Sequence, residues 1–142
     1  MNCNESFLNH PNMGKLFLRL GTGGLMLFHG IFKIRTNIAE ITYWMATSGL
    51  PQFLAYGVYI GEVIAPILIL CGIFVRSASL IVAFNMLVAI FYLHIKGFGP
   101  FGLNEFGGLS AELDVLFLFS ALALVFLGGG KYGLSGARNK MS

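Results

Sequence analysis

The sequence predicts an all-α membrane protein, folded as a four-helix transmembrane antiparallel bundle with a short interfacial helix between the first two helices. Of the 142 residues, 56% are hydrophobic and only 11% are charged, whereas soluble domains carry about 25% charged residues. The apolar residues gather into four runs, each near the roughly 20 residues that a helix needs to cross a bilayer. The joins between these runs are short, so we expect the whole chain, residues 1–142, to form a single domain.

Each apolar run is expected to be a helix, because backbone N–H and C=O groups in lipid must be satisfied within their own segment. The runs cover residues 13–34, 53–74, 77–96 and 110–128. So few residues separate the second run from the third that the two must form an antiparallel hairpin with a very tight turn. The first run lacks the small-residue cleavage site of a signal peptide, so we expect it to be retained.

The other two joins are longer and lie on the same side of the predicted bundle. Residues 36–52 predict a short amphipathic helix in the membrane interface, with Asn37 as its cap and Glu40 in its first turn. Its expected apolar face consists of Ile38, Ile41, Trp44 and Met45. Residues 97–109 are rich in glycine and phenylalanine without a helical period, which fits either a re-entrant cover or a pliable connection. Two such segments on one face indicate that this face is the working side.

Lysine and arginine are distributed unevenly between the two sides. With four crossings, both termini share a side with the tight turn. Six basic residues belong to that side (Lys15, Arg19, Arg76, Lys131, Arg138 and Lys140) and three to the other (Lys33, Arg35 and Lys96). The positive-inside rule therefore places both termini in the cytoplasm. In a bacterial host, we expect a multi-pass inner-membrane protein whose longer joins face the periplasm.

The polar residues within the runs fall mostly in the half of the bundle that faces away from the termini. A charged side chain facing lipid costs about 2.5–3.5 kcal/mol, so such groups normally turn inward and pair. Glu62 is the acid that lies deepest in a run, and we expect it to meet His29 or Lys33, which share a helix face through their four-residue spacing. The other candidates for a polar pocket are His94 and Glu112, with Arg19, Asn85 and Asp114 as lesser candidates.

A pocket of histidines, a lysine and carboxylates suits a proton, an anion or the polar head group of a quinone. The alternative is structural, because His94 and Glu112 are shallow enough to reach water and the deeper groups can act as internal glue. No helix carries a closely spaced pair of metal ligands, so no metal site is predicted. A haem held by His29 and His94 is disfavoured. Cys3 and Cys71 form no CxxC pair, which argues against thiol redox chemistry.

Four stretches combine these polar positions with glycines in a fixed order: "RLGTGGLMLFHGIFKI", "GEVIAPILILCGIFVRSASL", "NMLVAIFYLHIKGF" and "AELDVLFLFSALALVFLGGGKYGLS". Together, over about residues 13–136, they resemble the DoxX family of small four-helix integral membrane proteins. The resemblance implies a membrane bundle and, in some members, association with quinone-linked sulfur or thiol oxidation and with oxidative-stress partners. Pro66 departs from the family, which more usually has small residues there. The positions that match the family's polar residues are Arg19, His29, Lys33, Glu62, Arg76, His94 and Glu112.

Two classes of function follow from these observations. The first is an accessory redox-linked subunit that binds a quinone or a small redox partner in the polar pocket and relays protons through Glu62 and the histidines. The second is a non-redox protein, either a small-solute or proton permease or a membrane assembly anchor. The sequence shows no redox centre of its own, which favours a non-catalytic subunit of a quinone-linked oxidoreductase over a complete enzyme. The expected partners are the lipid bilayer, a membrane or periplasmic redox protein and a second copy in an oligomer, but not nucleic acid.

Overall fold

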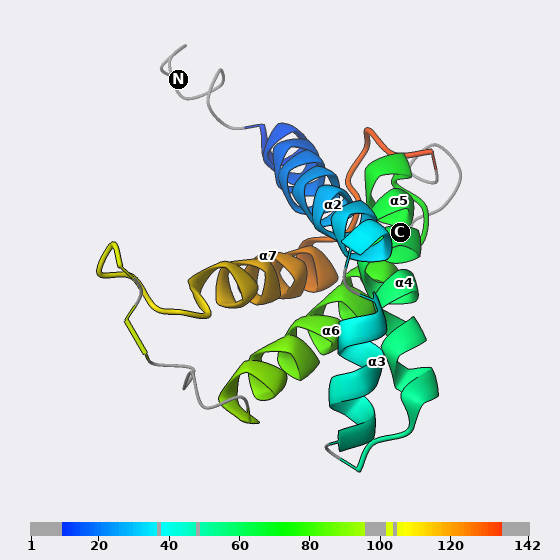
Figure 1. The fold of residues 1–142 in the computed structure, drawn as a ribbon. Helices are drawn as coiled ribbons and strands as arrows, with labels where there is room; N and C mark the ends of the chain where they lie inside the picture. The colour runs from blue at the N-terminus through cyan, green and yellow to red at the C-terminus, as the bar shows by residue number, and fades with distance from the viewer. Residues whose placement is uncertain (1–9, 37, 48, 96–101, 104, 135–142) are drawn as a thin grey trace, which may run out of the picture.

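A computed structural model describes residues 10–36, 38–47, 49–95, 102–103 and 105–134, without the side chains of Trp44, Leu93, His94 and Ile95. Within these residues the chain is helical apart from its joins, and the only β-type pairing is an isolated bridge between Leu103 and Leu109. The predicted all-α class is therefore confirmed. Four helical stretches and one short helix make up the described fold (Figure 1).

The first stretch is α2 (Pro11–Thr36), which is longer at both ends than the predicted run. A proline suits its first position because that residue's N–H would have no partner inside the helix. The short helix α3 (Ile38–Thr47) follows and covers 10 of the residues 36–52 that were expected to form the interfacial helix. Met45 of α3 is buried and Ile41 is half-buried, so the predicted apolar face does pack against the bundle. The predicted cap, Asn37, lies outside the described residues.

The second stretch is not the continuous α-helix that the sequence predicted for residues 53–74. It consists of a 3₁₀ segment η1 (Gln52–Tyr56), one turn α4 (Gly57–Tyr59), a π-helical segment η2 (Ile60–Ile64) and α5 (Ala65–Cys71). The π-helical segment ends two residues before Pro66, which has no N–H to donate to the carbonyl group of Glu62, four residues earlier. Proline thus explains why the α-helical hydrogen-bonding pattern is interrupted at this point.

The stretch ends three residues earlier than predicted because Gly72 adopts a left-handed conformation with φ of 71°. Its N–H donates to Ile69 O at 3.1 Å, and the N–H of Ile73 donates to Leu68 O at 2.9 Å. This pair of hydrogen bonds is the usual way in which a glycine closes a helix. The next helix, α6 (Val75–Ile95), begins at once, so the predicted tight hairpin is confirmed.

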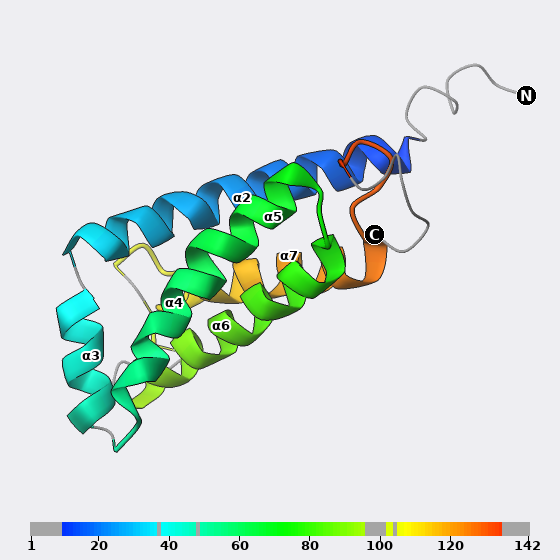
Figure 2. The same cartoon turned by 90° about the vertical axis from the view of Figure 1, so that its right-hand side faces the viewer.

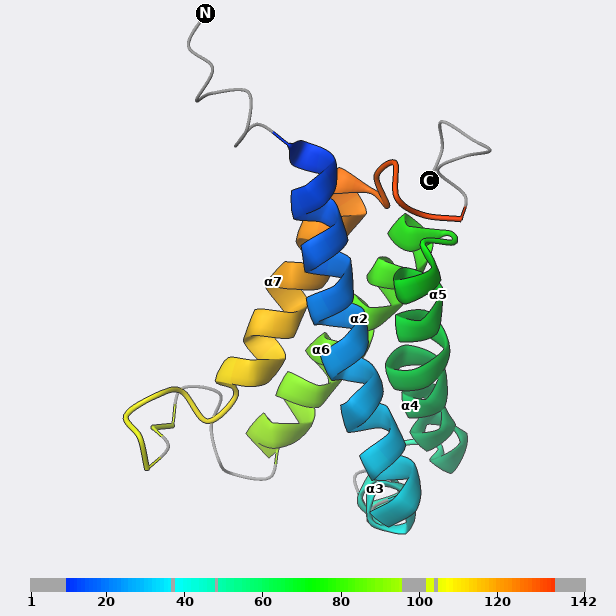
Figure 3. The same cartoon turned by 90° about the horizontal axis from the view of Figure 1, so that it is seen from above.

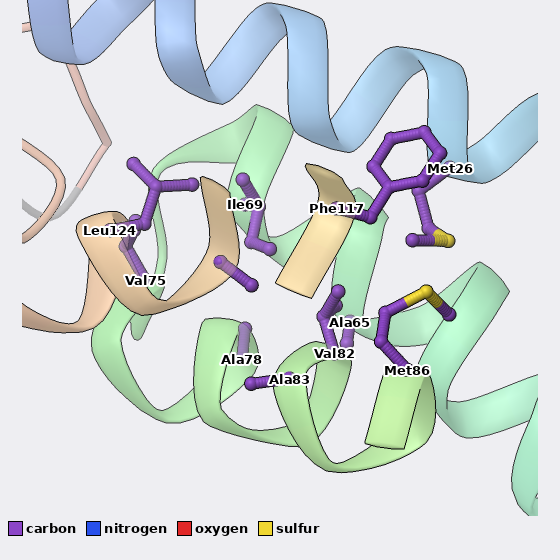
Figure 4. Close-up of a cluster of buried hydrophobic side chains, with 11 residues drawn as sticks. Met26, Ala65, Ile69, Val75, Ala78, Val82, Ala83, Met86, Phe117 and Leu124 are labelled. Atoms are coloured by element: carbon purple, nitrogen blue, oxygen red, sulfur yellow. The ribbon is translucent and has the colours of Figure 1, made fainter. Parts of the chain in front are cut away.

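The fourth stretch is α7 (Glu112–Leu127). Figure 3 shows α2 between α7 on one side and α5 on the other, with α6 behind them. The core between these helices contains small and apolar side chains from all four stretches (Figure 4). Its buried members are Met26, Ala65, Ile69, Val75, Ala78, Val82, Ala83, Met86, Phe117, Ala121 and Leu124.

The start of α2, the end of α5 and the end of α7 lie together at one end of the molecule, and α3 lies at the other (Figure 2). The backbone N–H of Lys131 donates to Asn12 Oδ1 at 3.2 Å, which joins the two ends of the described chain. Arg19 reinforces this end from inside. It is 1% exposed, and its guanidinium donates to Ile69 O at 2.9 Å, Leu70 O at 2.9 Å and Gly129 O at 3.0 Å.

Two of the described helical stretches are long and apolar enough by themselves to cross a membrane. They are Gln52–Cys71, with a mean hydropathy of 2.0, and Val75–Tyr92, with a mean hydropathy of 1.7. The chain therefore carries membrane-type helices.

Candidate functional site

The Glu62 carboxylate lies at the centre of the candidate site. It projects from the π-helical segment η2 and is 1% exposed. Lys33 Nζ of α2 donates to Glu62 Oε1 at 2.6 Å, and Asn85 Nδ2 of α6 donates to the same oxygen at 3.0 Å. The predicted pairing of Glu62 with a basic group of the first helix is thereby confirmed, with Lys33 as the partner.

The second carboxylate oxygen, Glu62 Oε2, is buried and has no hydrogen-bonding partner among the described residues. Buried polar atoms in folded proteins are normally hydrogen-bonded, and exceptions point to a bound water, a ligand or a proton. A buried carboxylate with one oxygen held and the other free can exchange a proton at the free oxygen while the first keeps the side chain in place.

Two glycines allow three helices to converge on Glu62. A Cβ atom at Gly30 of α2 would collide with the backbone carbonyl of Glu62. A Cβ atom at Gly61 would lie 2.6 Å from Asn85 Cγ. Both positions therefore require glycine, and the resulting close approach brings Lys33 and Asn85 within reach of the carboxylate.

A cavity of about 210 Å³ opens beside the Lys33, Glu62 and Asn85 cluster, between α3, the second stretch and α6. The cluster makes one polar end, and apolar side chains form most of the remaining wall. Several water molecules, or one small ring, would fit, since a single water needs about 10–15 Å³. The other lining residues are Glu40, Ile41, Met45, Val58, Val88, Ala89 and Tyr92. We call this space the large cavity.

A second cavity, of about 20 Å³, lies where α2, η2, α6 and α7 meet, and Glu62 and Lys33 line this one too. His29 stands over it, with its ring edge-on to Phe117 at 5.9 Å between centroids. Asp114, in the first turn of α7, interacts electrostatically with Lys33, Glu62 and His29. The apolar lining residues are Met26, Met86, Leu113 and Phe117. We call this space the small cavity.

The structure thus gathers five of the predicted site residues around these cavities: His29, Lys33, Glu62, Asn85 and Asp114. It places Arg19 apart from them, bound to backbone carbonyls at the opposite end of the bundle. Glu112 is exposed, and its carboxylate lies against Gly108 of the preceding loop rather than in either cavity. His94 belongs to α6, but its side chain lies outside the described residues, so its predicted role is untested.

Four residues of the site were not predicted from the sequence. Tyr92 and Glu40 line the large cavity, and Gly30 and Gly61 allow the helices to approach Glu62. Asn85, Val88, Ala89 and Tyr92 follow one another at helical spacing, so the face that carries Asn85 also carries Tyr92. This helical spacing could have predicted that Tyr92 lies on the same side of the helix as Asn85. In the part of the chain that the structure describes, no three His, Cys, Asp or Glu side chains lie close enough together to hold a metal ion.

Comparison with known proteins adds an independent finding. The model of the DoxX family matches residues 14–95, which include Lys33, Glu62 and Asn85. An uncharacterized protein of Haemophilus influenzae is 32% identical over 120 residues, covering 83% of the chain and 85% of that protein. "Putative oxidoreductase CatD" of Bacillus subtilis (strain 168) is 30% identical over 125 residues, covering 88% of the chain and 84% of CatD. No solved structure matches the chain.

Proposed function

Since the chain belongs to the DoxX family of membrane proteins, we propose that it is an accessory membrane subunit of a redox system and binds the head group of a quinone in the large cavity. The oxidoreductase named among its relatives supports a redox context.

All four helical stretches cross the membrane in this proposal. Their outward faces carry large apolar side chains that water would not favour, such as Phe28 at 75%, Phe84 at 69% and Phe126 at 80% exposed. A bilayer buries such surface at no cost, whereas a soluble monomer rarely exposes it over every helix. With 16 residues, α7 is about 24 Å long, so it crosses a hydrocarbon core with help from its flanking residues.

The charged side chains of α2 are compatible with a helix that crosses the membrane, because Arg19 and Lys33 both have partners inside the protein. Arg19 is satisfied by three carbonyl groups and Lys33 by the Glu62 carboxylate. Both face the bundle rather than lipid, as intramembrane charges do when they have a structural or functional role. The clustering of basic residues near the joined ends supports a cytoplasmic position for that end.

The lining of the large cavity is the observation that carries the ligand proposal. A quinone is a flat apolar ring with carbonyl acceptors at its edges. The large cavity offers the matching surfaces, namely the donors Lys33 and Asn85 at one end and apolar walls around the remainder. Its volume of about 210 Å³ accepts the head group, and the tail would extend into lipid.

Reduction of a quinone to a quinol adds two electrons and two protons to its carbonyl oxygens. In this proposal the electrons come from a partner redox protein. Glu62 supplies these two protons one after the other through its carboxyl group and takes up a new proton after each transfer, while Oε1 stays anchored by Lys33 and Asn85. The chain thereby acts as a binding and proton-handling subunit rather than as a complete enzyme.

Quenching of tryptophan fluorescence tests quinone binding directly. Trp44 is the only tryptophan of the chain and lies on α3, the helix that covers the large cavity. Titration of the purified protein in lipid nanodiscs with a short-chain ubiquinone is expected to give saturable quenching. Ala89→Phe should fill the cavity and weaken binding about tenfold or more, because overpacking excludes a ligand that needs the same volume.

Leu87→Phe is the matched control, since Leu87 is on the same helix but is 53% exposed on the outer face. It should bind quinone as the unchanged protein does. Quenching that never saturates, or that is equal in the Ala89→Phe and Leu87→Phe variants, contradicts the quinone proposal and favours a membrane anchor.

A further inference from the structure

We propose that the small cavity holds one water molecule and that this water, with Asp114, forms a proton route from α7 to Glu62 that is separate from the large cavity. The proposal deepens the function above, on which it rests for its purpose, by identifying where the proton of Glu62 comes from. Its test needs no quinone.

Glu62 and Lys33 form the wall between the two cavities, because both residues line both spaces. The hydrogen bonds of Oε1 are made with Lys33 and Asn85, and both of these residues border the large cavity. Oε2 is the oxygen that has no partner in the described part of the chain. A water molecule in the small cavity would give Glu62 Oε2 the hydrogen-bonding partner that it lacks among the described residues.

The small cavity has the volume and the polar lining that a single water requires. Its volume of about 20 Å³ exceeds the 10–15 Å³ that a water occupies by this measure, and it leaves no room for a second one. A buried water also needs two to four polar partners. Glu62, Asp114 and His29 all border the space, and so do Met26, Met86 and Phe117. The last three belong to the hydrophobic core drawn in Figure 4.

The route continues outward from the water. Asp114 is half-buried and His29 is exposed, so both can exchange protons with the outside. The titratable groups that face the cavity are His29 and Lys33 from α2, Glu62 from η2 and Asp114 from α7, whereas α6 contributes only Met86. Lys33 is already engaged in the ion pair with Glu62, which leaves Asp114 as the carboxyl group opposite Glu62.

The transfer balances without any further reactant. The carboxyl group of Asp114 gives its proton to the water, and the water passes one of its own protons to Glu62 Oε2. Asp114 then takes up a proton from the outside. A bound ligand in the large cavity does not obstruct this path, so ligand and proton reach Glu62 from different sides.

A pH jump followed by infrared spectroscopy tests the route. After rapid acidification of the protein in nanodiscs, the carboxyl C=O band of protonated Glu62 should appear, identified by its absence in Glu62→Gln. Asp114→Asn should slow this appearance about tenfold or more, as expected when a positioned acid group is lost. Asp114→Glu should restore the rate, which excludes a merely structural effect. Glu105→Gln, at an exposed position, is the control for the loss of one negative charge and should leave the rate unchanged.

The Ala89→Phe variant distinguishes the proposed route through the small cavity from a route through the large cavity. Because it fills only the large cavity, the rate of Glu62 protonation should stay the same although quinone binding is lost. Slowing by Ala89→Phe without slowing by Asp114→Asn would overturn the proposed route in favour of access through the large cavity. An unchanged rate in Asp114→Asn would also overturn it. Absence of saturable quinone quenching, in contrast, contradicts the quinone proposal and leaves the proton route standing.

Discussion

Gly30 sets the distance between α2 and the second stretch at the position of Glu62. A hydrogen atom is all that fits between its Cα and the carbonyl group of Glu62, which belongs to the π-helical segment. Three residues further along α2, Lys33 reaches the carboxylate of the same residue. One glycine therefore determines whether the ammonium and the carboxylate meet at hydrogen-bonding distance.

Gly30→Ala is expected to destabilise the protein by about 1–3 kcal/mol, the usual cost of overpacking a core. The added methyl group meets backbone rather than a flexible side chain, so α2 and η2 must separate. Thermal unfolding in detergent measures the loss. Gly24→Ala is the matched control, because nothing lies within 4 Å of a Cβ atom at that position of the same helix. Equal melting temperatures for the two variants would contradict this account.

The pairing of Glu62 with Lys33 could be predicted from the sequence, because a deep carboxylate in lipid needs a partner and few basic groups lie at its depth. The partner on α6 was harder to identify. Asn85 carries no charge, so no electrostatic requirement pointed to it. Arg19 was grouped with the pocket because any buried charge suggests a site, whereas backbone carbonyls satisfy it at the far end.

Pro66 determines where the second helical stretch departs from α-helical geometry. A π-helix has about one residue more per turn than an α-helix. The π-helical segment before Pro66 therefore changes the direction in which Glu62 projects. Such segments recur at functional sites in other proteins. The irregular helix is thus part of how the carboxylate reaches the bundle interior.

Pro66→Ala restores an N–H group that can donate to Glu62 O, and we expect η2 to revert to α-helix. Each residue of an α-helix turns by about 100°, so loss of the extra residue rotates Glu62 away from Lys33. Quinone affinity should fall about tenfold or more in the tryptophan assay, and the melting temperature should fall as well, because Pro66 is fully buried and the buried Glu62 carboxylate loses its ion-pair partner. Ile67→Ala, at the neighbouring exposed position, is the control. Unchanged affinity in Pro66→Ala would argue against a role for the π-helical segment.

The existence of the helices was predictable, but the irregularity within the second one was not. Apolar runs of about 20 residues identify each stretch, and glycine at position 72 explains the end of α5. In contrast, a run that is apolar on all sides gives no periodic signal from which one extra residue per turn could be detected. The proline marked the place of the interruption without indicating its type.

The joined ends of the chain are the basis of the orientation that we propose for the whole molecule. Asn12 and Lys131 meet at one end of the bundle, next to the ends of α5 and α7, and α3 covers the other end. If the positive-inside rule holds for the basic residues near the joined ends, as we propose, this end lies in the cytoplasm. Both cavities that border Glu62 would then lie in the half that faces away from the cytoplasm.

Reporter fusions test this orientation. Alkaline phosphatase, which is active only outside the cytoplasm, should be inactive when it is fused after Ser142. The same enzyme inserted between Gly49 and Leu50, directly after α3, should be active. The reverse pattern would mean that the large cavity opens toward the cytoplasm.

The Arg19 cluster also has a consequence for biosynthesis. Two of its three acceptors, Ile69 O and Leu70 O, are synthesised with α5, but the third, Gly129 O, follows α7 near the end of the chain. In the membrane arrangement that we propose, a nascent chain that stops before residue 129 leaves one guanidinium donor unmatched inside the membrane, where each unsatisfied group is costly. The first helix would then reach its final state only after the last one has been inserted, and truncated chains would differ from complete ones by an unmatched donor on Arg19.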